Sequence, residues 1–173
     1  MIEIKKNKKA RESQRSIYKA LRRILLVKNL NDITVQDVSD ECGISRSTFY
    51  RNYNNVVDVL DVMFDWFYNR YLNQRIEETN QLLFFFQYWV KHRDLVHIIS
   101  HQNEGLIKNC IKRHEPSDNT NPYLIDLKCA ILTSLLSRWS ESKKETPEEM
   151  EKLTRKMLNQ KCIDILLKNG ENL

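Results

Sequence analysis

The sequence predicts an all-α fold, and three observations support that prediction. The 173 residues include only 3 glycines and 3 prolines, whereas the turns that connect β-strands rely on both residue types. Apolar residues recur at intervals of three and four along much of the chain, which is the period of a helix with one buried face. Residues that cap helices, such as Thr34 and Thr146, precede several of these segments. We therefore expect an N-terminal three-helix domain over residues 1–55 and a C-terminal helical domain over residues 56–173.

The first expected helix covers residues 10–29. Ile17 and Leu21 lie on one face of it, and basic side chains fall largely on the opposite side. Asn29 and Asn31 flank its exit, where asparagine tolerates the left-handed conformation that ends many helices.

Two short helices separated by a glycine follow. Thr34 can cap the first helix, and Asp37, three residues on, can return a hydrogen bond to the cap. Gly43 ends this helix, and Ser45 caps the next one, which covers residues 46–51. Two short helices held together by apolar residues across a glycine turn form a helix-turn-helix, whose second helix enters the major groove of DNA.

The second of these helices carries side chains suited to DNA. Arg46 can donate two parallel hydrogen bonds to a guanine edge or to a phosphate. Ser47 and Thr48 are short enough to touch bases or phosphates, and Tyr50 and Tyr53 offer hydroxyl groups to phosphates. The phenylalanine among them has no polar group, so we expect it in the core.

Positive charge is concentrated in the same part of the chain. Residues 1–55 hold 12 basic and 6 acidic residues, a net charge of +6, whereas residues 56–173 hold 16 and 17, a net charge of −1. Such a distribution suits a polyanion, because DNA phosphates supply most of the sequence-independent affinity. A membrane surface would attract the same charge, but the helix-turn-helix favours DNA. The basic arm from Lys5 to Arg11 is open to two interpretations, a solubilising tail or a segment that reaches the DNA.

The segment TVQDVSDECGISRSTFYRNY, residues 34–53, resembles the DNA-binding signature of TetR/AcrR-type transcriptional regulators. In that family two small alanines stand at the positions of Ser39 and Cys42, and phenylalanine is common at the position of Tyr53. The resemblance covers about residues 8–65 and implies an N-terminal DNA-binding domain followed by a helical ligand-binding and dimerisation domain.

Matching the family's motif implies a set of DNA contacts. The residues expected at bases are Arg46, Ser47 and Thr48, those expected at phosphates are Thr34, Tyr50 and Tyr53, and Ser45 and Arg51 belong to the same surface. One departure concerns the start of the next helix, where the family usually carries a lysine that approaches a phosphate and this chain has Val56. The phosphate clamp is therefore weaker than usual or provided by another basic residue.

A long helix over about residues 56–79 and an apolar helix over residues 80–92 are expected next. The second is hydrophobic nearly all round, which predicts a central, buried position. The aromatic residues of both helices either line a pocket for a small apolar or aromatic ligand or pack as plain core. The residues assigned to the pocket are Phe64, Phe67, Phe86, Tyr88 and Trp89. In TetR-type proteins the long helix transmits the ligand signal to the DNA-binding helices.

Residues 94–113 are expected to form one or two shorter helices, interrupted near residues 103–105. His97, His101 and Glu104 are spaced so that one helical face could hold two imidazoles and a carboxylate around zinc. The expected break intervenes and no fourth ligand is evident, so we expect neither a metal nor a cofactor.

The last two expected helices cover about residues 122–140 and 147–170. Pro122 and Pro147 suit the first turns, and Thr146 begins a capping box. Both helices have an apolar stripe, which is buried either inside the monomer or against the same helices of a second copy, in a four-helix bundle. The family resemblance favours the homodimer.

The function expected from these observations is a cytoplasmic regulator that binds double-stranded operator DNA, and the family resemblance implies a repressor controlled by a small ligand. The alternative is a co-activator or interaction protein with the same fold that acts through a protein partner. An enzyme is not expected, because the sequence has no nucleophile elbow, phosphate-binding glycine loop or paired catalytic carboxylates. No apolar run is long enough for a membrane span, no signal peptide is expected, and the four cysteines form no CxxC pair.

Overall fold

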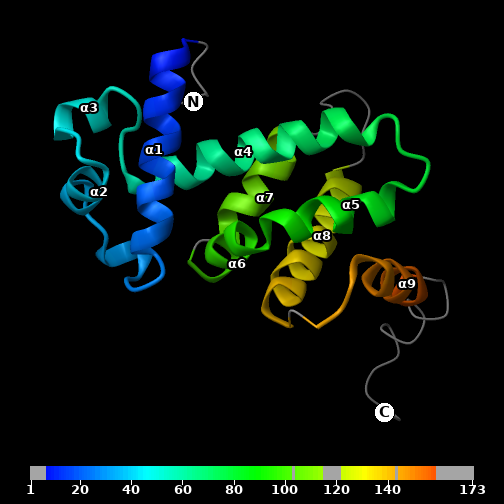
Figure 1. The fold of residues 1–173 in the computed structure, drawn as a ribbon. Helices are drawn as coiled ribbons and strands as arrows, with labels where there is room; N and C mark the ends of the chain where they lie inside the picture. Colours follow the sequence, from blue (N-terminus) through cyan, green and yellow to red (C-terminus); the bar gives the residue numbers. More distant parts are fainter. Residues whose placement is uncertain (1–6, 103, 115–121, 143, 159–173) are drawn as a thin grey trace.

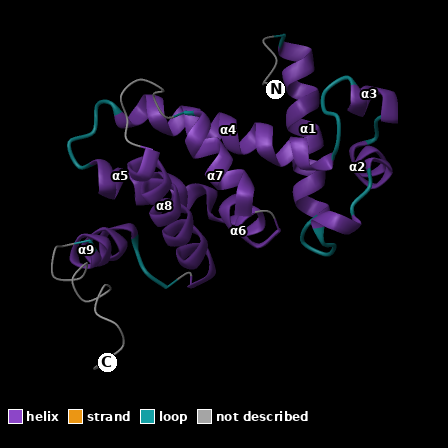
Figure 2. Ribbon diagram, turned by 180° about the vertical axis from the view of Figure 1, so that it is seen from behind, coloured by secondary structure: helices purple, strands orange, loops and turns teal. Residues whose placement is uncertain are grey.

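The computed structural model describes residues 7–102, 104–114, 122–142 and 144–158, and every regular element within these ranges is a helix (Figures 1 and 2). The all-α prediction is therefore confirmed. The expected arm before Asn7 and the part of the last expected helix beyond Leu158 lie outside the described residues. Among the described helices, none is both long enough and apolar enough to cross a membrane.

The N-terminal helices form a unit that we call the head. It consists of α1 (Lys8–Ile24), the 3-10 turn η1 (Leu30–Asp32), α2 (Val35–Cys42) and α3 (Arg46–Tyr50). Helix α1 begins earlier than predicted because the Asn7 side chain accepts hydrogen bonds from the backbone amides of Lys9 and Ala10, at 3.0 and 3.4 Å. It also ends earlier, at Ile24, because the amides of Leu26 and Val27 bond to carbonyls three residues back, which tightens the chain into a turn.

Each helix of the head contributes to one buried core. Ile17 and Leu21 of α1, Val38 of α2 and Phe49 of α3 are all fully buried. Burying side chains of this size is favourable by roughly 1.5–3 kcal/mol each. The packing of α2 on α1 and of α3 on α2 therefore sets the orientation of the short α3.

The remaining helices form a unit that we call the body. They are α4 (Val56–Arg75), α5 (Gln81–Trp89), η2 (Val90–His92), α6 (Arg93–Gln102), α7 (Glu104–Arg113), α8 (Pro122–Ser142) and α9 (Pro147–Met157). Helix α4 leaves the head and runs across the body, α8 packs against α6 and α7, and α9 packs against α5 (Figure 1). The predicted interruption near residues 103–105 is confirmed by the separate helices α6 and α7.

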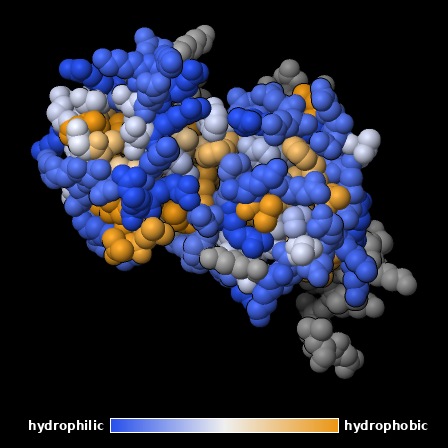
Figure 3. All heavy atoms as spheres, in the orientation of Figure 1, coloured by the Kyte–Doolittle hydropathy of each residue, from blue (hydrophilic) through white to orange (hydrophobic). Residues whose placement is uncertain are grey.

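Head and body share a continuous hydrophobic core. Tyr18 of α1 lies beside Phe67 of α4, with ring centroids 6.5 Å apart. An ion pair between Arg22 and Asp94, 3.1 Å long, adds a polar contact between α1 and α6. Figure 3 shows that hydrophobic side chains also reach the surface near the end of α1, where Leu26 is largely exposed.

Candidate nucleic-acid interface

Helix α2 begins with the predicted capping box. The Asp37 backbone amide donates to the Thr34 hydroxyl oxygen at 3.1 Å, and the Thr34 amide donates to the Asp37 carboxylate at 2.6 Å. The Lys28 ammonium lies 3.0 Å from the same carboxylate. Hydrogen bonds from Thr34, together with Lys28, lower the pKa of Asp37 to about 2. Since all these partners are near in sequence, the start of α2 is specified locally.

A left-handed glycine connects α2 to α3. Gly43 has φ +66° and ψ +34°, and its amide donates to the carbonyl oxygens of Asp40 and Ser39 at the end of α2. L-residues with a Cβ rarely adopt this conformation, whereas glycine adopts it freely. The glycine therefore both terminates α2 and turns the chain into α3.

Helix α3 presents a polar face to solvent. The Ser45 hydroxyl oxygen accepts a hydrogen bond from the Thr48 amide at 3.2 Å and so caps the helix. Phe49 faces the core, whereas Arg46 and Ser47 are exposed and Tyr50 is 49% exposed. Phe49 is thus the buried residue of a short helix whose other side chains are exposed or half-buried.

The position of α3 leaves this face open. Figures 1 and 2 show α3 at the outer edge of the head, remote from the body, with the beginning of α1 at the same end of the molecule. Lys8, Lys9 and Arg11 are exposed at that end of α1. The outer side of the head therefore combines the polar face of α3 with three basic side chains.

Solved structures share this arrangement over nearly the whole chain. A fatty acid degradation regulator, FadR from Bacillus halodurans, is 16% identical with a TM-score of 0.57, covering 89% of this chain and 96% of that chain. A TetR transcriptional regulator from Streptococcus agalactiae is 16% identical with a TM-score of 0.53, covering 88% and 96%. The chain has the TetR-type fold.

The structure of a protein from Listeria innocua, Lin0861, is similar with a TM-score of 0.70, at 18% identity, covering 88% of this chain and 92% of that chain. No protein-family model and no curated protein sequence matches the chain. The resemblance of residues 34–53 to the TetR/AcrR signature is thus accompanied by a matching fold at low sequence identity.

Tyr53, which was expected at a phosphate, lies in the interior of the head. Its side chain is fully buried beside Phe49, with ring centroids 6.0 Å apart, and its hydroxyl donates to the Gln14 carbonyl at 3.4 Å. Burial raises the pKa of the Tyr53 phenol well above its usual value. The residue fastens the end of α3 to α1 and faces away from the exposed surface.

The start of α4 holds Val56 at the position where TetR-type proteins usually carry a phosphate-binding lysine. Val56 is buried, and the cap of α4 is Asn55, whose side-chain oxygen accepts from the Asp58 amide at 2.9 Å. The Asn54 amide donates to the Asp58 carboxylate at 3.1 Å. This helix start is therefore closed by its own residues and provides no cation.

Several basic residues of the head are neutralised by acidic partners. The ion pairs are Arg22–Asp94, Arg23–Glu41 and Lys28–Asp37. Arg46 makes no ion pair with another described residue, and the same holds for Lys8, Lys9 and Arg11. Within the described residues of the head, the positive charge without an ion pair therefore includes that on α3 and at the beginning of α1, together with Arg15 and Lys19 farther along α1.

The aromatic residues assigned to a ligand pocket pack mostly against one another. Phe64 stacks on Trp89, with centroids 5.1 Å apart, and both are fully buried. The Tyr88 hydroxyl donates to the Phe67 carbonyl at 2.7 Å. Phe86 is fully buried and points elsewhere, against Trp139 of α8 at 5.2 Å. The structure thus brings four of the five together as filled core and separates the fifth.

Three cavities lie away from this cluster. One of about 320 Å³ lies between α1 and α6, one of about 380 Å³ between α7 and α8, and one of about 800 Å³ beside α8 and α9. None of the five aromatic residues lines these three cavities. The third has a mixed lining that includes Trp139, Met150 and Arg138.

His97 and His101, which the sequence analysis placed with Glu104, lie together, and the acidic residue beside them is Glu141. The rings of His97 and His101 are 4.2 Å apart, and His101 Nε2 lies 3.2 Å from a carboxylate oxygen of Glu141 on α8. The side chain of Glu104 is outside the described residues.

A second polar group was missed by the sequence reasoning. Asp65 of α4 lies against Cys110 and His114 at the end of α7. The spacing of four between Cys110 and His114 was visible in the sequence, but their meeting with Asp65, 45 residues before Cys110, was not.

Proposed function

We propose that the protein is a sequence-specific DNA-binding transcription regulator that places α3 in the major groove. The observation that carries this proposal is the exposed polar face of α3, held by the buried Phe49 in a head of TetR-type fold. An α-helix fits the major groove, where side chains can distinguish all four base pairs. The proposal places the protein in the cytoplasm, with the DNA it regulates.

The proposed contacts follow the exposure of the side chains. Arg46 is positioned to bind a guanine edge or a phosphate, and Ser47 and Thr48 to touch bases. Thr34 and Tyr50 would contact phosphates on either side, with Ser45 and Arg51 on the same surface. Tyr53 is left out because it is buried.

The missing lysine at Val56 is compensated, on this proposal, from α1. Lys8, Lys9 and Arg11 are exposed at the end of α1 that lies toward α3 (Figure 1). Removing one protein–phosphate interaction should reduce the slope of log affinity against log salt concentration by about 0.9. Replacing these three residues by glutamine should therefore lower the slope by up to about 2.7, and an unchanged slope would contradict their role.

The proposal includes a homodimer formed through α8 and α9. Tyr123 on α8 is 84% exposed, and Leu124 and Leu127 on the same helix and Leu153 and Met157 on α9 are also exposed. Apolar side chains exposed on both helices are suited to an interface with a second copy. The heads of the two subunits would then contact DNA half-sites that lie about one turn of the DNA helix apart. A monomeric mass in light scattering at micromolar concentration would refute the dimer.

The test of sequence-specific binding uses fragmented genomic DNA from the host. Bound fragments are recovered and sequenced for the natural protein, for an Arg46→Ala, Tyr50→Ala variant and for Lys91→Ala. Lys91 is a control because it is exposed in η2 of the body, remote from α3 and outside the helices proposed to form the dimer. Enrichment of a few palindromic sites that is lost in the first variant and kept in the control supports the proposal.

Binding without sequence preference would refute the proposal and favour a co-activator that needs a protein partner. The buried Val56 is the observation that favours this second candidate. Repression is the regulatory outcome that we propose, since it is the commoner one among TetR-type proteins. Control by a small ligand also belongs to the proposal, with the cavity beside α8 and α9 as its location, because about 800 Å³ lies in the range of ligand sites. Leu153 and Met157 line this cavity and also belong to the proposed dimer interface, so a ligand bound there would lie at that interface.

A further inference from the structure

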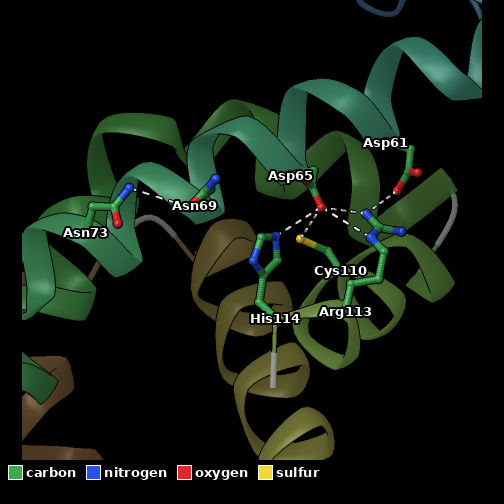
Figure 4. A network of polar contacts seen from close by, with 7 residues as sticks. All are labelled: Asp61, Asp65, Asn69, Asn73, Cys110, Arg113 and His114. Atoms are coloured by element: carbon green, nitrogen blue, oxygen red, sulfur yellow. Dashed lines mark hydrogen bonds and ion pairs between the residues drawn. The ribbon is translucent and has the colours of Figure 1, made fainter. Parts of the chain in front are cut away.

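Helices α4 and α7 meet through a cluster that contains three different metal-binding groups (Figure 4). Asp65 lies on α4, Cys110 lies on α7, and His114 follows Cys110 one turn later, directly after the last residue of α7. His114 Nε2 is 3.1 Å from Asp65 Oδ1, and the Cys110 thiol donates to the same oxygen at 3.8 Å. One ligand atom from each residue lies within 4.8 Å of the other two.

These separations suit a small metal ion. Zinc binds sulfur at about 2.3 Å and nitrogen or oxygen at about 2.0–2.2 Å, so neighbouring ligands of a tetrahedral ion are roughly 3.3–3.8 Å apart. The distances of 3.1 and 3.8 Å to Asp65 Oδ1 fall close to that interval. Thiolate, imidazole and carboxylate are also the three ligand types that zinc accepts in proteins. We propose that Asp65, Cys110 and His114 bind one Zn²⁺ ion, with a fourth position left for water.

The charges of the cluster agree with a divalent cation. Asp61 and Asp65 carry two negative charges, and Arg113, which lies 2.9 Å from a carboxylate oxygen of each, carries one positive charge. The formal charge is therefore −1 with a neutral thiol and −2 with a thiolate. Binding of one Zn²⁺ ion would make the formal charge of the cluster with its thiolate zero, so that no net charge is left in this half-buried part of the protein.

Binding proceeds by an exchange of protons and hydrogen bonds. The Cys110 S–H bond breaks, its proton passes to solvent, and a zinc–sulfur bond forms. Arg113 gives up its hydrogen bonds to Asp65 and keeps the one to Asp61. His114 supplies the Nε2 lone pair and carries its proton on Nδ1. Asp65 and His114 are partly exposed, with side chains 29% and 21% accessible, so the ion can enter from solvent.

An ion in this position joins α4 to α7. Because α4 continues directly from the head, zinc would hold the head in one orientation relative to the body. The effect on DNA affinity rests on the function proposed above and is measured separately, by adding zinc to the DNA-binding assay. Zinc binding itself is tested without DNA. Failure of the zinc site is therefore distinguishable from failure of the proposed DNA-binding function.

The test uses the full chain, reduced and treated with a chelator, and Co²⁺ as a spectroscopic substitute for Zn²⁺. The natural protein should saturate at one Co²⁺ per chain and show a thiolate-to-cobalt charge-transfer band in the near ultraviolet, which one equivalent of Zn²⁺ removes. Cys110→Ser should abolish the band. Cys42→Ser is the matched control, since Cys42 lies in the head, and it should keep the band.

His114→Gln supplies a second variant that does not depend on the buried cysteine. It should weaken cobalt affinity by more than about tenfold, whereas His101→Gln, which changes a histidine on α6, should leave it unchanged. Circular dichroism at the titration temperature checks that each variant is folded. Absence of a saturable band in the natural protein, or a band that survives in folded Cys110→Ser or His114→Gln at unchanged affinity, would overturn the proposal.

Discussion

Replacing Gly43 by alanine tests the backbone conformation that sets α3 against α2. The residue has φ +66° and ψ +34°, and a Cβ added there meets no atom within 4 Å. Steric contact therefore contributes nothing, and the cost is that of holding an L-residue in the left-handed region, about 1–2 kcal/mol. For a chain of this length such a loss lowers Tm by roughly 2–8 °C.

A series of substitutions separates conformation from contact. Asparagine tolerates the left-handed region better than alanine, and a β-branched residue tolerates it least. Stability should therefore fall in the order glycine, asparagine, alanine, valine when thermal unfolding is followed by circular dichroism at one protein concentration. DNA affinity measured well below Tm should change little, because the exposed face of α3 is untouched.

Two results would refute this reasoning about Gly43. Alanine without any loss of stability would mean that the left-handed turn is not required. A loss of more than about 4 kcal/mol would mean that atoms clash, contrary to the open space around the glycine.

The remaining predictions concern a carboxylate, two tyrosines and one core ring. The pKa of Asp37 in the folded protein, about 2, lies below the ordinary value of 3.8. The ionised Asp37 carboxylate should therefore stabilise the fold fully above about pH 4, and this stabilisation should be lost as pH falls toward 2. Asp37→Asn should remove that part of the pH dependence when unfolding is followed in acid titrations. Tyr53→Phe should lower the unfolding free energy by about 1 kcal/mol or less without weakening DNA binding. Tyr50→Phe should weaken DNA binding, measured by fluorescence anisotropy, by about fivefold at unchanged stability. Weaker DNA binding in Tyr53→Phe and unchanged binding in Tyr50→Phe would place Tyr53 at the interface instead. Phe86→Ala should lower the unfolding free energy by about 3–5 kcal/mol in urea titrations, since the ring is packed core, and a loss below about 1 kcal/mol would indicate a pocket wall instead.

Local signals in the sequence were enough to predict the helix-turn-helix and much of the candidate interface. The cap at Thr34, the turn at Gly43 and the cap at Ser45 depend on partners within four residues. The few glycines and prolines together with the helical period predicted the all-α class, and the lack of a polar group on Phe49 predicted its core position. Interactions of such short range appear directly as spacing along the chain, which is why they could be predicted.

Which polar and aromatic residues are exposed and which are buried depends on packing between distant parts of the chain. Tyr53 looked like a surface hydroxyl, but its partner is Gln14, 39 residues away. Phe64 and Trp89 would suit a pocket or a core equally, and their stacking decides for core. Asp65 meets His114 across 49 residues. Such contacts arise from how whole helices pack, and the free energy of that packing depends on the shape of the entire core.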